Sequence, residues 1–445
     1  MGLGLSQYLP LVVYIGCCIM CLVALTGRPI WTLYYLMPLL PYRTLRDRLG
    51  EFPLGGNMLT VLVLATVIGG LIKGGSLPKS KLYTIWLIFG VYLYLSMWLG
   101  ALLGNGPIPL WLSDQNFVTW KDYMLMPLLL VATGLVVKSR SEVRMVIIIT
   151  AVSLLLIDRS SILESMSRSF AHFDESKRDA GPLGFAGSNG LAAFLSQFTM
   201  FFWGFAQYVR NKKHRLICYG IVATSLFATM YTFSRASYIA VVAGAALLGI
   251  FKNRKLLIVV FVFLLTWQTV VPSAVTERVT MTQDSNGRLE ASAAERVKLW
   301  EAARDSFISS PIFGTGFATF QFGSHVDGLR DTHNWYVKVL TETGLIGAAI
   351  ALAMLLQMIK VAYGLFRHGE GPLYQGLGFG LLLACAATFI LNLFGDRWTY
   401  VEINGLLWIL IGAAIRVSNM PDSETETDLA STPVLASPNP YLVYR

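Results

Sequence analysis

Long apolar stretches separated by short polar connections recur along almost the whole chain. They are continuously apolar and do not alternate with polar positions, which predicts helices. In lipid the backbone must satisfy its own hydrogen bonds, so such helices form a membrane-spanning bundle. We predict an all-α polytopic membrane protein with about twelve spans, each long or nearly long enough to cross a core of roughly 30 Å. The predicted spans are 8–26, 57–72, 82–104, 123–138, 145–157, 189–209, 216–232, 236–251, 255–272, 345–366, 374–394 and 402–416.

One further apolar stretch, residues 30–40, is short and is interrupted by prolines. Pro29, Pro38 and Pro41 bound or break it, so a half-span or a tilted helix is expected there. The orientation of the first two apolar segments therefore stays open.

Basic connections orient the second half of the chain. The segments 210–215 and 252–255 are rich in Lys and Arg, which places them in the cytoplasm. By alternation, the connections 158–188, 233–237, 273–344 and 396–400 lie on the opposite face. The expected organisation is a bundle over 1–272, a large periplasmic loop over 273–344, further transmembrane helices over 345–417 and a disordered cytoplasmic tail over 418–445.

The composition agrees with a membrane protein. Hydrophobic residues make up 55% of the chain and charged residues only 14%, well below the share of a soluble domain. The net charge of +9 resides in short connections between spans, so nucleic-acid binding is not expected. The five cysteines lie in apolar spans and imply neither a disulfide framework nor a zinc site.

The large loop carries candidate chemistry. Its segment 294–307 predicts an amphipathic helix whose stripe of Val297, Trp300, Ala303 and Phe307 can lie on the membrane surface. His333 follows, with Asp331 or Thr332 as the expected N-cap of the next helix. The positive end of that helix would keep the imidazole neutral and able to accept a proton. His333 is thus either a general base or a residue that only caps the helix.

Arginines gather on the same predicted face. Arg235 is the most unusual, because it lies in a minimal turn between two long apolar spans. A guanidinium in that position suits a diphosphate, although a single arginine can equally be an interfacial anchor or an ion-pair partner. No Asp-x-Asp pair or P-loop is present, so a metal or nucleotide is not expected. The set comprises Arg178, Arg235, Arg288, Arg296, Arg304, Arg330 and Arg397.

These residues, in their order, resemble the O-antigen ligase and O-antigen polymerase superfamily of bacterial inner membranes. The resemblance spans about residues 178–347. It rests on Arg178 with 181–184 and 188–192, on the turn 233–237, on 296–300 with 311–316, and on 333–347. Where the family usually has a Pro-Asn pair, this chain has Ser188 and Asn189.

The resemblance implies a periplasmic active face, no metal or other cofactor, and a glycan donor carried on undecaprenyl diphosphate. It implies that His333 activates an acceptor hydroxyl. Arg178, Arg235 and Arg296 would bind the diphosphate, and Arg288 would share or replace the role of Arg296. Asn189 and Asn334 would support the site. A single displacement would invert the anomeric carbon.

Three acceptors remain open for such an enzyme: a lipid A core sugar, another lipid-linked repeat unit, or a protein hydroxyl. The absence of an extra soluble acceptor region disfavours the protein acceptor, and ligase-like transfer is our leading hypothesis. The alternative from another class is a transporter of lipid-linked glycans. It is disfavoured because nearly all ionisable residues lie at span ends rather than at mid-membrane. A third possibility, a structural scaffold, would not explain why the arginines and His333 cluster on one face.

Overall fold

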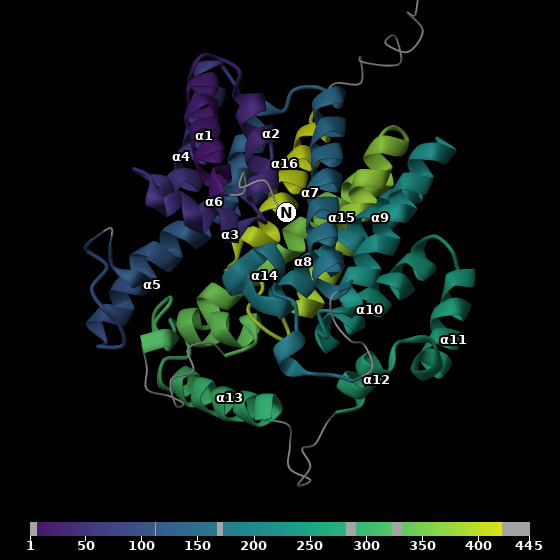
Figure 1. The fold of residues 1–445 in the computed structure, drawn as a ribbon. Coiled ribbons are helices and arrows are strands. Elements are labelled where there is room, and N and C mark those ends of the chain that lie inside the picture. The colour runs from purple at the N-terminus through teal and green to yellow at the C-terminus, as the bar shows by residue number, and fades with distance from the viewer. Residues whose placement is uncertain (1–6, 112, 167–171, 282–290, 323–331, 421–445) are drawn as a thin grey trace, which may run out of the picture.

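The computed structural model describes residues 7–111, 113–166, 172–281, 291–322 and 332–420, and helices are the regular secondary structure in this part of the chain. The helices, in chain order (Figure 1), are α1 (Leu9–Leu25), α2 (Pro29–Leu39), α3 (Arg43–Arg48), η2 (Leu49–Glu51), η3 (Gly55–Asn57), α4 (Met58–Ile72), α5 (Lys81–Leu102), α6 (Gln115–Val136), α7 (Arg140–Met166), η4 (Glu175–Lys177), η5 (Gly181–Ala186), α8 (Gly187–Ala206), α9 (Lys212–Met230), α10 (Arg235–Phe251), α11 (Lys255–Val270), α12 (Ser273–Thr280), α13 (Ala291–Ser309), η6 (Phe320–Phe322), α14 (Trp335–His368), α15 (Gly371–Leu391) and α16 (Val401–Val417).

A helix occupies each predicted apolar span. By length and apolarity, five of the described helices could cross a membrane, or six if α11 and α12 form one bent span. This agrees with a polytopic membrane protein, whereas the number of about twelve crossings stays a prediction. The short stretch after Pro29 is helical too, since Pro29 occupies its first turn and Pro38 its last.

Three helices are longer than the apolar pattern predicts. Helix α6 begins at Gln115 rather than near residue 123. Helix α7 continues through Asp158 to Met166, and α14 begins at Trp335 rather than near residue 345. The connections predicted at 158–188 and 273–344 are therefore partly helical, and the large loop contains α12, α13 and η6.

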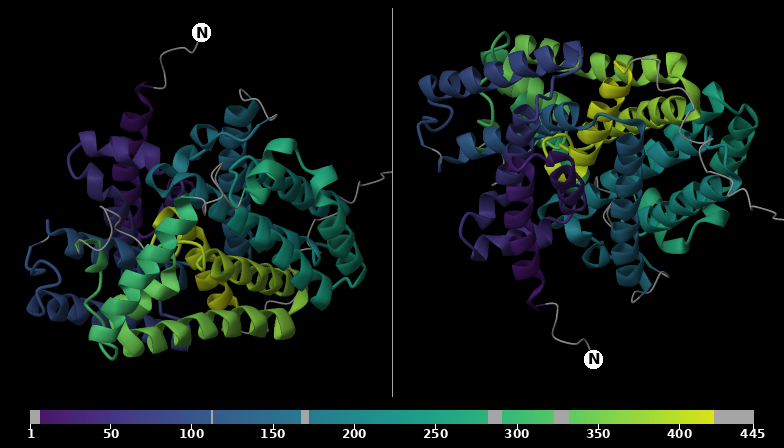
Figure 2. Two further views of the ribbon diagram at one scale, coloured as in Figure 1. Left: turned by 90° about the horizontal axis from the view of Figure 1, so that it is seen from below. Right: turned by 90° about the horizontal axis from the view of Figure 1, so that it is seen from above.

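The core of the bundle lies around α16 and α8. Every residue of α16 except Arg416 is buried, and most of α8 is buried as well. A helix that is apolar all round belongs at the centre of a bundle, where neighbours cover each of its faces. Helix α16 packs on α6, and α8 packs on α9 and α15. Beside them, α14 lies along one edge of the molecule, against α15 (Figure 2).

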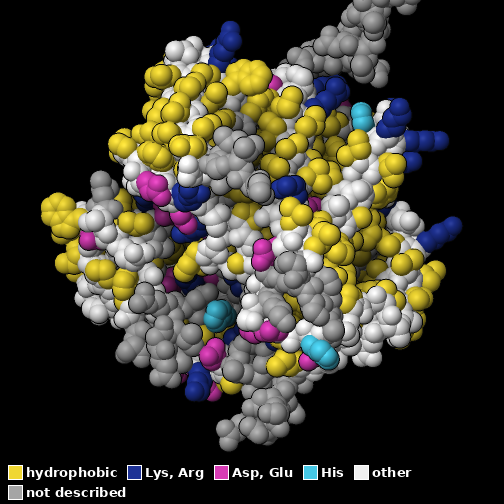
Figure 3. Space-filling view, in the orientation of Figure 1, with side chains coloured by type: hydrophobic (Ala, Val, Ile, Leu, Met, Phe, Trp, Pro, Cys, Tyr) yellow, Lys and Arg dark blue, Asp and Glu magenta, His cyan; other side chains and the backbone are white. Residues whose placement is uncertain are grey.

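Much of the outer surface is apolar. Figure 3 shows hydrophobic side chains over much of one face, with Lys and Arg projecting at its margins. Helix α11 has no buried residue, and its Ile258, Phe261 and Leu265 are more than half exposed. Such surfaces are costly in water, so they match the membrane environment predicted from the sequence.

The amphipathic helix predicted in the large loop exists as α13, but its buried face differs from the predicted stripe. Leu299 and Ala303 are buried against Phe320, whereas Val297 and Trp300 are 47% and 42% exposed. The indole N–H of Trp300 donates to the carbonyl of Thr332, 3.0 Å away. The contact with Phe320 thus uses Leu299 and Ala303, and the placement of the predicted stripe on the membrane surface stays a prediction.

A glycine kink in α14 joins this loop to the bundle. Gly344 has φ +62°, and the turn 311–316 packs into the bend. The amide of Leu345 donates to the carbonyl of Pro311 at 2.9 Å, and the amide of Gly316 donates to the carbonyl of Glu342 at 2.9 Å. These bonds satisfy backbone groups at the break in the helix.

Two cavities lie at opposite ends of the same helices. One, of about 540 Å³, is lined by residues from the C-terminal end of α15 and from the segments just before α14 and α16. The other, of about 750 Å³, is reached by the end of α14, the start of α15 and the end of α16. Since α15 has 21 residues and is about 32 Å long, the cavities are separated by roughly the thickness of a bilayer core.

Candidate active site

The smaller cavity brings His333 together with four of the arginines that the sequence singled out. Its wall comes from the segment before α8, the α9–α10 turn, α12, α13, and the segments before α14 and α16. The lining residues are Glu175, Arg178, Asn189, Phe233, Ser234, Arg235, Ala236, Ile239, Arg278, Glu295, Arg296, His333, Leu391, Phe394 and Arg397. Residues more than 200 positions apart in the chain thus meet in one place.

Arg178 is held rigidly in this wall. Its guanidinium donates to Oε1 of Glu175 at 2.6 Å, to Oδ1 of Asn189 at 2.7 Å and to the carbonyl of Thr232 at 3.3 Å. Asn189 lies in the first turn of α8, so it ties the arginine to the start of that helix. Three acceptors around one planar group fix its orientation as well as its position.

Arg235 and Arg278 lie on the neighbouring wall. Arg235 is the first residue of α10, and its Nη1 donates to the carbonyl of Met281 at 2.9 Å. Arg278, on α12, is 6% exposed and stacks over the ring of Phe173 at 4.8 Å. Phe233 lies in the α9–α10 turn at φ +53° and packs with Ala274 and Val275 of α12, so the turn that precedes Arg235 contacts the helix that carries Arg278.

His333 lies immediately outside α14 and is half-buried. The N-cap of α14 is Asn334, whose Oδ1 accepts from the amides of Tyr336 at 3.0 Å and Val337 at 3.2 Å. The expectation of Thr332 as the cap is therefore wrong, and Asp331 lies outside the described residues. His333 itself has φ +52°, a left-handed conformation that His tolerates better than most residues. This turn directs it to the cavity wall ahead of the helix.

Arg397 lies in the segment between α15 and α16 and is the fifth arginine of the cavity lining. Its neighbour Asp396 is 2% exposed and accepts from the ammonium of Lys338 at 2.9 Å and from the amides of Trp398 and Thr399 at 3.1 Å. Burial alone would raise the pKa of Asp396, but Lys338 and the hydrogen bonds from Thr399 lower it below its usual value. A charged Asp396 therefore fixes the loop that carries Arg397.

The structure brings together five of the seven residues predicted for the site. Arg178, Asn189, Arg235, Arg296 and His333 line the cavity, while Asn334 acts one residue away as the cap. Arg288 lies outside the described residues. Arg304 is 74% exposed and does not line the cavity.

Sequence reasoning missed Arg278, Glu175 and Glu295 as lining residues. Arg278 stands in the last turn of a short helix of the large loop, and its place among the loop cations was the only available signal. The two glutamates carried no motif, and their proximity to the arginines follows from tertiary packing alone.

The cavity lining is strongly cationic and partly apolar. Five arginines line it against two glutamates, and Phe233, Ile239, Leu391 and Phe394 supply apolar surface. Guanidinium groups suit the oxygens of a diphosphate, and the apolar surface suits a lipid or sugar face. Within the described residues, no group of three or more His, Cys, Asp or Glu side chains is placed to hold a metal ion.

Part of this arrangement is similar to a known protein family. Residues 220–352 match the family model described as O-antigen ligase. The matched segment contains Arg235, Arg278, Arg296 and His333, whereas Arg178 and Arg397 join the cavity from outside it. No curated protein matches the chain. The resemblance seen in the sequence is therefore confirmed over residues 220–352, which are similar to the O-antigen ligase family model.

Proposed function

We propose that this protein transfers a preassembled glycan from undecaprenyl diphosphate to an acceptor hydroxyl, as an O-antigen ligase acting on lipid A core. The observation that carries the proposal is the convergence of Arg178, Arg235, Arg278, Arg296 and Arg397 on the cavity that His333 lines. Several guanidinium groups together can bind the oxygens of a diphosphate through charge-assisted hydrogen bonds. The O-antigen ligase domain supports a lipid-linked glycan as the donor.

The proposed reaction is a single displacement. The acceptor oxygen attacks the anomeric carbon, the bond from that carbon to the diphosphate oxygen breaks, and the hydroxyl proton passes to His333. Undecaprenyl diphosphate leaves with the electron pair of the broken bond. The arginines stabilise the negative charge that grows on it, so charge separation needs no reorganisation of water. Attack opposite the leaving group inverts the anomeric carbon.

The apolar residues of the cavity lining support a lipid-linked donor. Phe233, Ile239 and Leu391 lie beside the arginines, so a substrate with a charged diphosphate and an apolar tail can use both surfaces. A repeat-unit polymerase would use the same donor chemistry with a different acceptor. The productive acceptor therefore distinguishes the ligase from the polymerase.

The test uses full-length protein in detergent with a lipid-linked oligosaccharide and separate acceptors, lipid A core or a second lipid-linked repeat, with no metal added. Glycan transfer is scored by mass. We expect wild type to transfer to lipid A core. His333→Ala should lose about a hundredfold or more in rate, as expected for removal of a general base. Arg235→Ala should lose about tenfold or more through one charge-assisted contact.

Arg304→Ala is the matched control, because Arg304 is also a loop arginine but is exposed and outside the cavity. It should transfer at the wild-type rate. Full activity of a folded His333→Ala protein would overturn the role of the base. An intact diphosphate bond with every acceptor would overturn the transferase proposal and make lipid translocation the function to test.

A further inference from the structure

The larger cavity, at the other end of α14, α15 and α16, is also lined by several cationic side chains. Lys79, Lys81, Arg140, Lys360 and His368 line it together with a single carboxylate, Glu370. Arg140 stands 3.8 Å from Glu370 and 5.1 Å from the ring centre of Tyr374, so the carboxylate is already engaged. Among the described residues, no carboxylate lies within ion-pair distance of Lys81 or Lys360.

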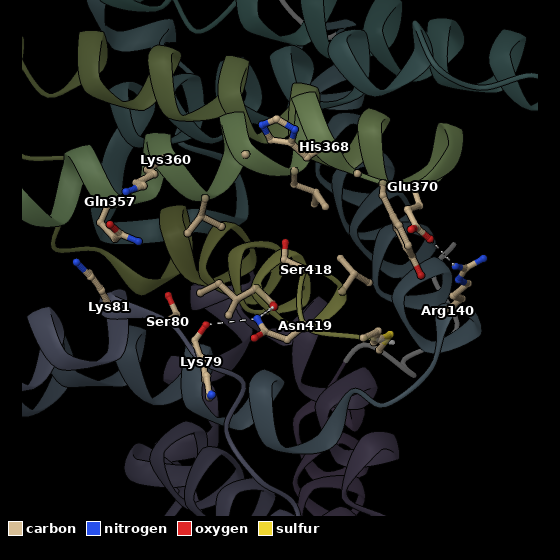
Figure 4. Close-up of a pocket in the computed structure, with 18 of the residues that line it drawn as sticks. Lys79, Ser80, Lys81, Arg140, Gln357, Lys360, His368, Glu370, Ser418 and Asn419 are labelled. Carbon is tan, nitrogen blue, oxygen red and sulfur yellow. Dashed lines mark hydrogen bonds and ion pairs between the residues drawn. The ribbon is translucent and has the colours of Figure 1, made fainter. Parts of the chain in front are cut away.

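The two lysines face each other across one end of this cavity. In Figure 4, Lys81 and Lys360 lie together with Gln357 between them, while Arg140 and Glu370 lie at the opposite end. Lys81 is the first residue of α5, and Lys360 comes from the last part of α14. The two charges come from separate helices, so an anion between them would form charge-assisted bonds to both.

Hydrogen bonds already build the walls of this site. The guanidinium of Arg416 donates to the carbonyls of Val137 at 2.8 Å and Ser76 at 3.2 Å, which ties the end of α16 to two neighbouring segments. Asn419 donates to the carbonyl of Lys79 at 3.3 Å. Ser80 caps α5 by accepting from the amide of Leu82 at 3.2 Å, so the positive end of a 22-residue helix opens beside the lysines.

We propose that this cavity binds a phosphate-bearing anion. Lys81 and Lys360 contact the phosphate as point charges, and Ser80 and Gln357 provide neutral polar contacts. Val361, Leu365 and Ile415 form an apolar part of the same lining. A basic pocket between membrane helices with an apolar wall suits a lipid phosphate, and its cationic end also accepts free phosphate. This inference is independent of the reaction at the other cavity.

The experiment measures binding of phosphatidylglycerol, phosphatidylcholine and inorganic phosphate to the full chain in detergent by native mass spectrometry. The variant is Lys81→Gln with Lys360→Gln. Its matched control is Lys212→Gln with Lys213→Gln, which removes two exposed charges at the start of α9, away from the cavity. We expect the site variant to bind the anionic probe about tenfold more weakly than wild type, and the control to bind like wild type.

The probes distinguish the two sources of phosphate. Binding of phosphatidylglycerol that inorganic phosphate does not displace assigns a lipid headgroup, and binding of inorganic phosphate alone assigns a soluble anion. Equal binding by wild type and the site variant, or equal binding of the neutral phosphatidylcholine, overturns the proposal. The sequence beyond Met420 contains Asp422, Glu424, Glu426 and Asp428. Probe binding only after removal of residues 421–445 would instead assign the cavity to that acidic segment and also overturn the proposal.

A second measurement on wild-type protein covers the case in which the site variant does not fold. Acetylation of lysines is followed by mass with and without the anionic probe. We expect the probe to slow modification of Lys81 and Lys360 at least severalfold while Lys212 and Lys213 react unchanged. Equal protection of all four lysines, or protection of none, would contradict a specific site.

Discussion

Arg178 and His333 reach the same cavity by different means. Arg178 is fixed by its side chain, since three acceptors surround its guanidinium. His333 is fixed by its backbone, since a left-handed conformation precedes the Asn334 cap of α14. The two means of fixation suit the two roles proposed for these residues, binding of an anion by Arg178 and proton acceptance by His333.

At the same scale, Asp396 is a buried charge, and its contribution to stability depends on its ion pair with Lys338. Asp396→Asn leaves the Lys338 ammonium, 19% exposed, without its carboxylate, so the protein should lose about 3 kcal/mol of stability at neutral pH. Thermal unfolding in detergent measures this loss. Adding Lys338→Met should recover part of it, because the unpaired charge is then removed.

The ion pair of Asp396 and Lys338 makes the stability of the folded protein depend on pH, and stability should fall as the pH is lowered. The pKa of Asp396 is lowered in the folded protein, because Lys338 and Thr399 outweigh the effect of burial. Its stabilisation is therefore complete above the unfolded value of about 3.9 and is lost as the pH falls through the lower folded value. Wild type should lose this contribution below about pH 4. An Asp396→Asn protein with the same acid dependence would contradict the assignment.

At the scale of elements, the continuous apolar stretches predicted where the helices lie but placed some of their ends incorrectly. The pattern ended the fifth span before Asp158, because a carboxylate is costly in a membrane helix. Helix α7 continues because Oδ2 of Asp158 accepts from the hydroxyls of Thr224 at 2.9 Å and Ser225 at 2.7 Å on α9. A partner 66 residues away cannot be read from local pattern.

The kink in α14 leads to a prediction about glycine. At Gly344, with φ +62°, a Cβ atom would collide with the backbone of Ile312 and Gly314. Gly344→Ala should therefore cost at least about 2 kcal/mol and separate the 311–316 turn from the helix. Thermal unfolding measures the cost. We expect glycan transfer to fall as well, because the part of α14 before the bend begins directly after His333 and its neighbour Asn334.

Gly364 provides the matched control within the same helix. No atom lies within 4 Å of a Cβ built there, and its backbone is helical. Gly364→Ala should leave stability unchanged or raise it by up to about 1 kcal/mol, since alanine favours the helix. If both alanine variants were equally stable, the bend at Gly344 would not depend on glycine.

At the scale of the whole molecule, the grouping of connections could be predicted, but the side-chain contacts could not. Alternation of spans placed Arg178, Arg235, Arg296 and His333 on one face, and the structure places them around one cavity. Arg278 lines the cavity because α12 turns away from α11 by 109°. That bend is set by packing of Ala274 and Val275 against Phe233, which no span pattern encodes.

The membrane orientation is the remaining prediction at this scale. Basic connections favour the cytoplasm, so Lys213 should be cytoplasmic and Arg304, on α13, periplasmic. Both side chains are exposed, and single cysteines at these positions would report their side. In spheroplasts, a membrane-impermeant maleimide should label Arg304→Cys without treatment and label Lys213→Cys only after permeabilisation.

The parent chain is the necessary control, because its own five cysteines include the exposed Cys18 on α1. Labelling above that background is the signal. The two cavities lie at opposite ends of α15, so the labelling pattern orients both of them at once. The predicted pattern puts the arginine cavity outside, where a translocated glycan donor would meet it, and the lysine cavity inside, beside anionic headgroups. The reversed pattern would place glycan transfer in the cytoplasm and would contradict the proposed donor and acceptor together.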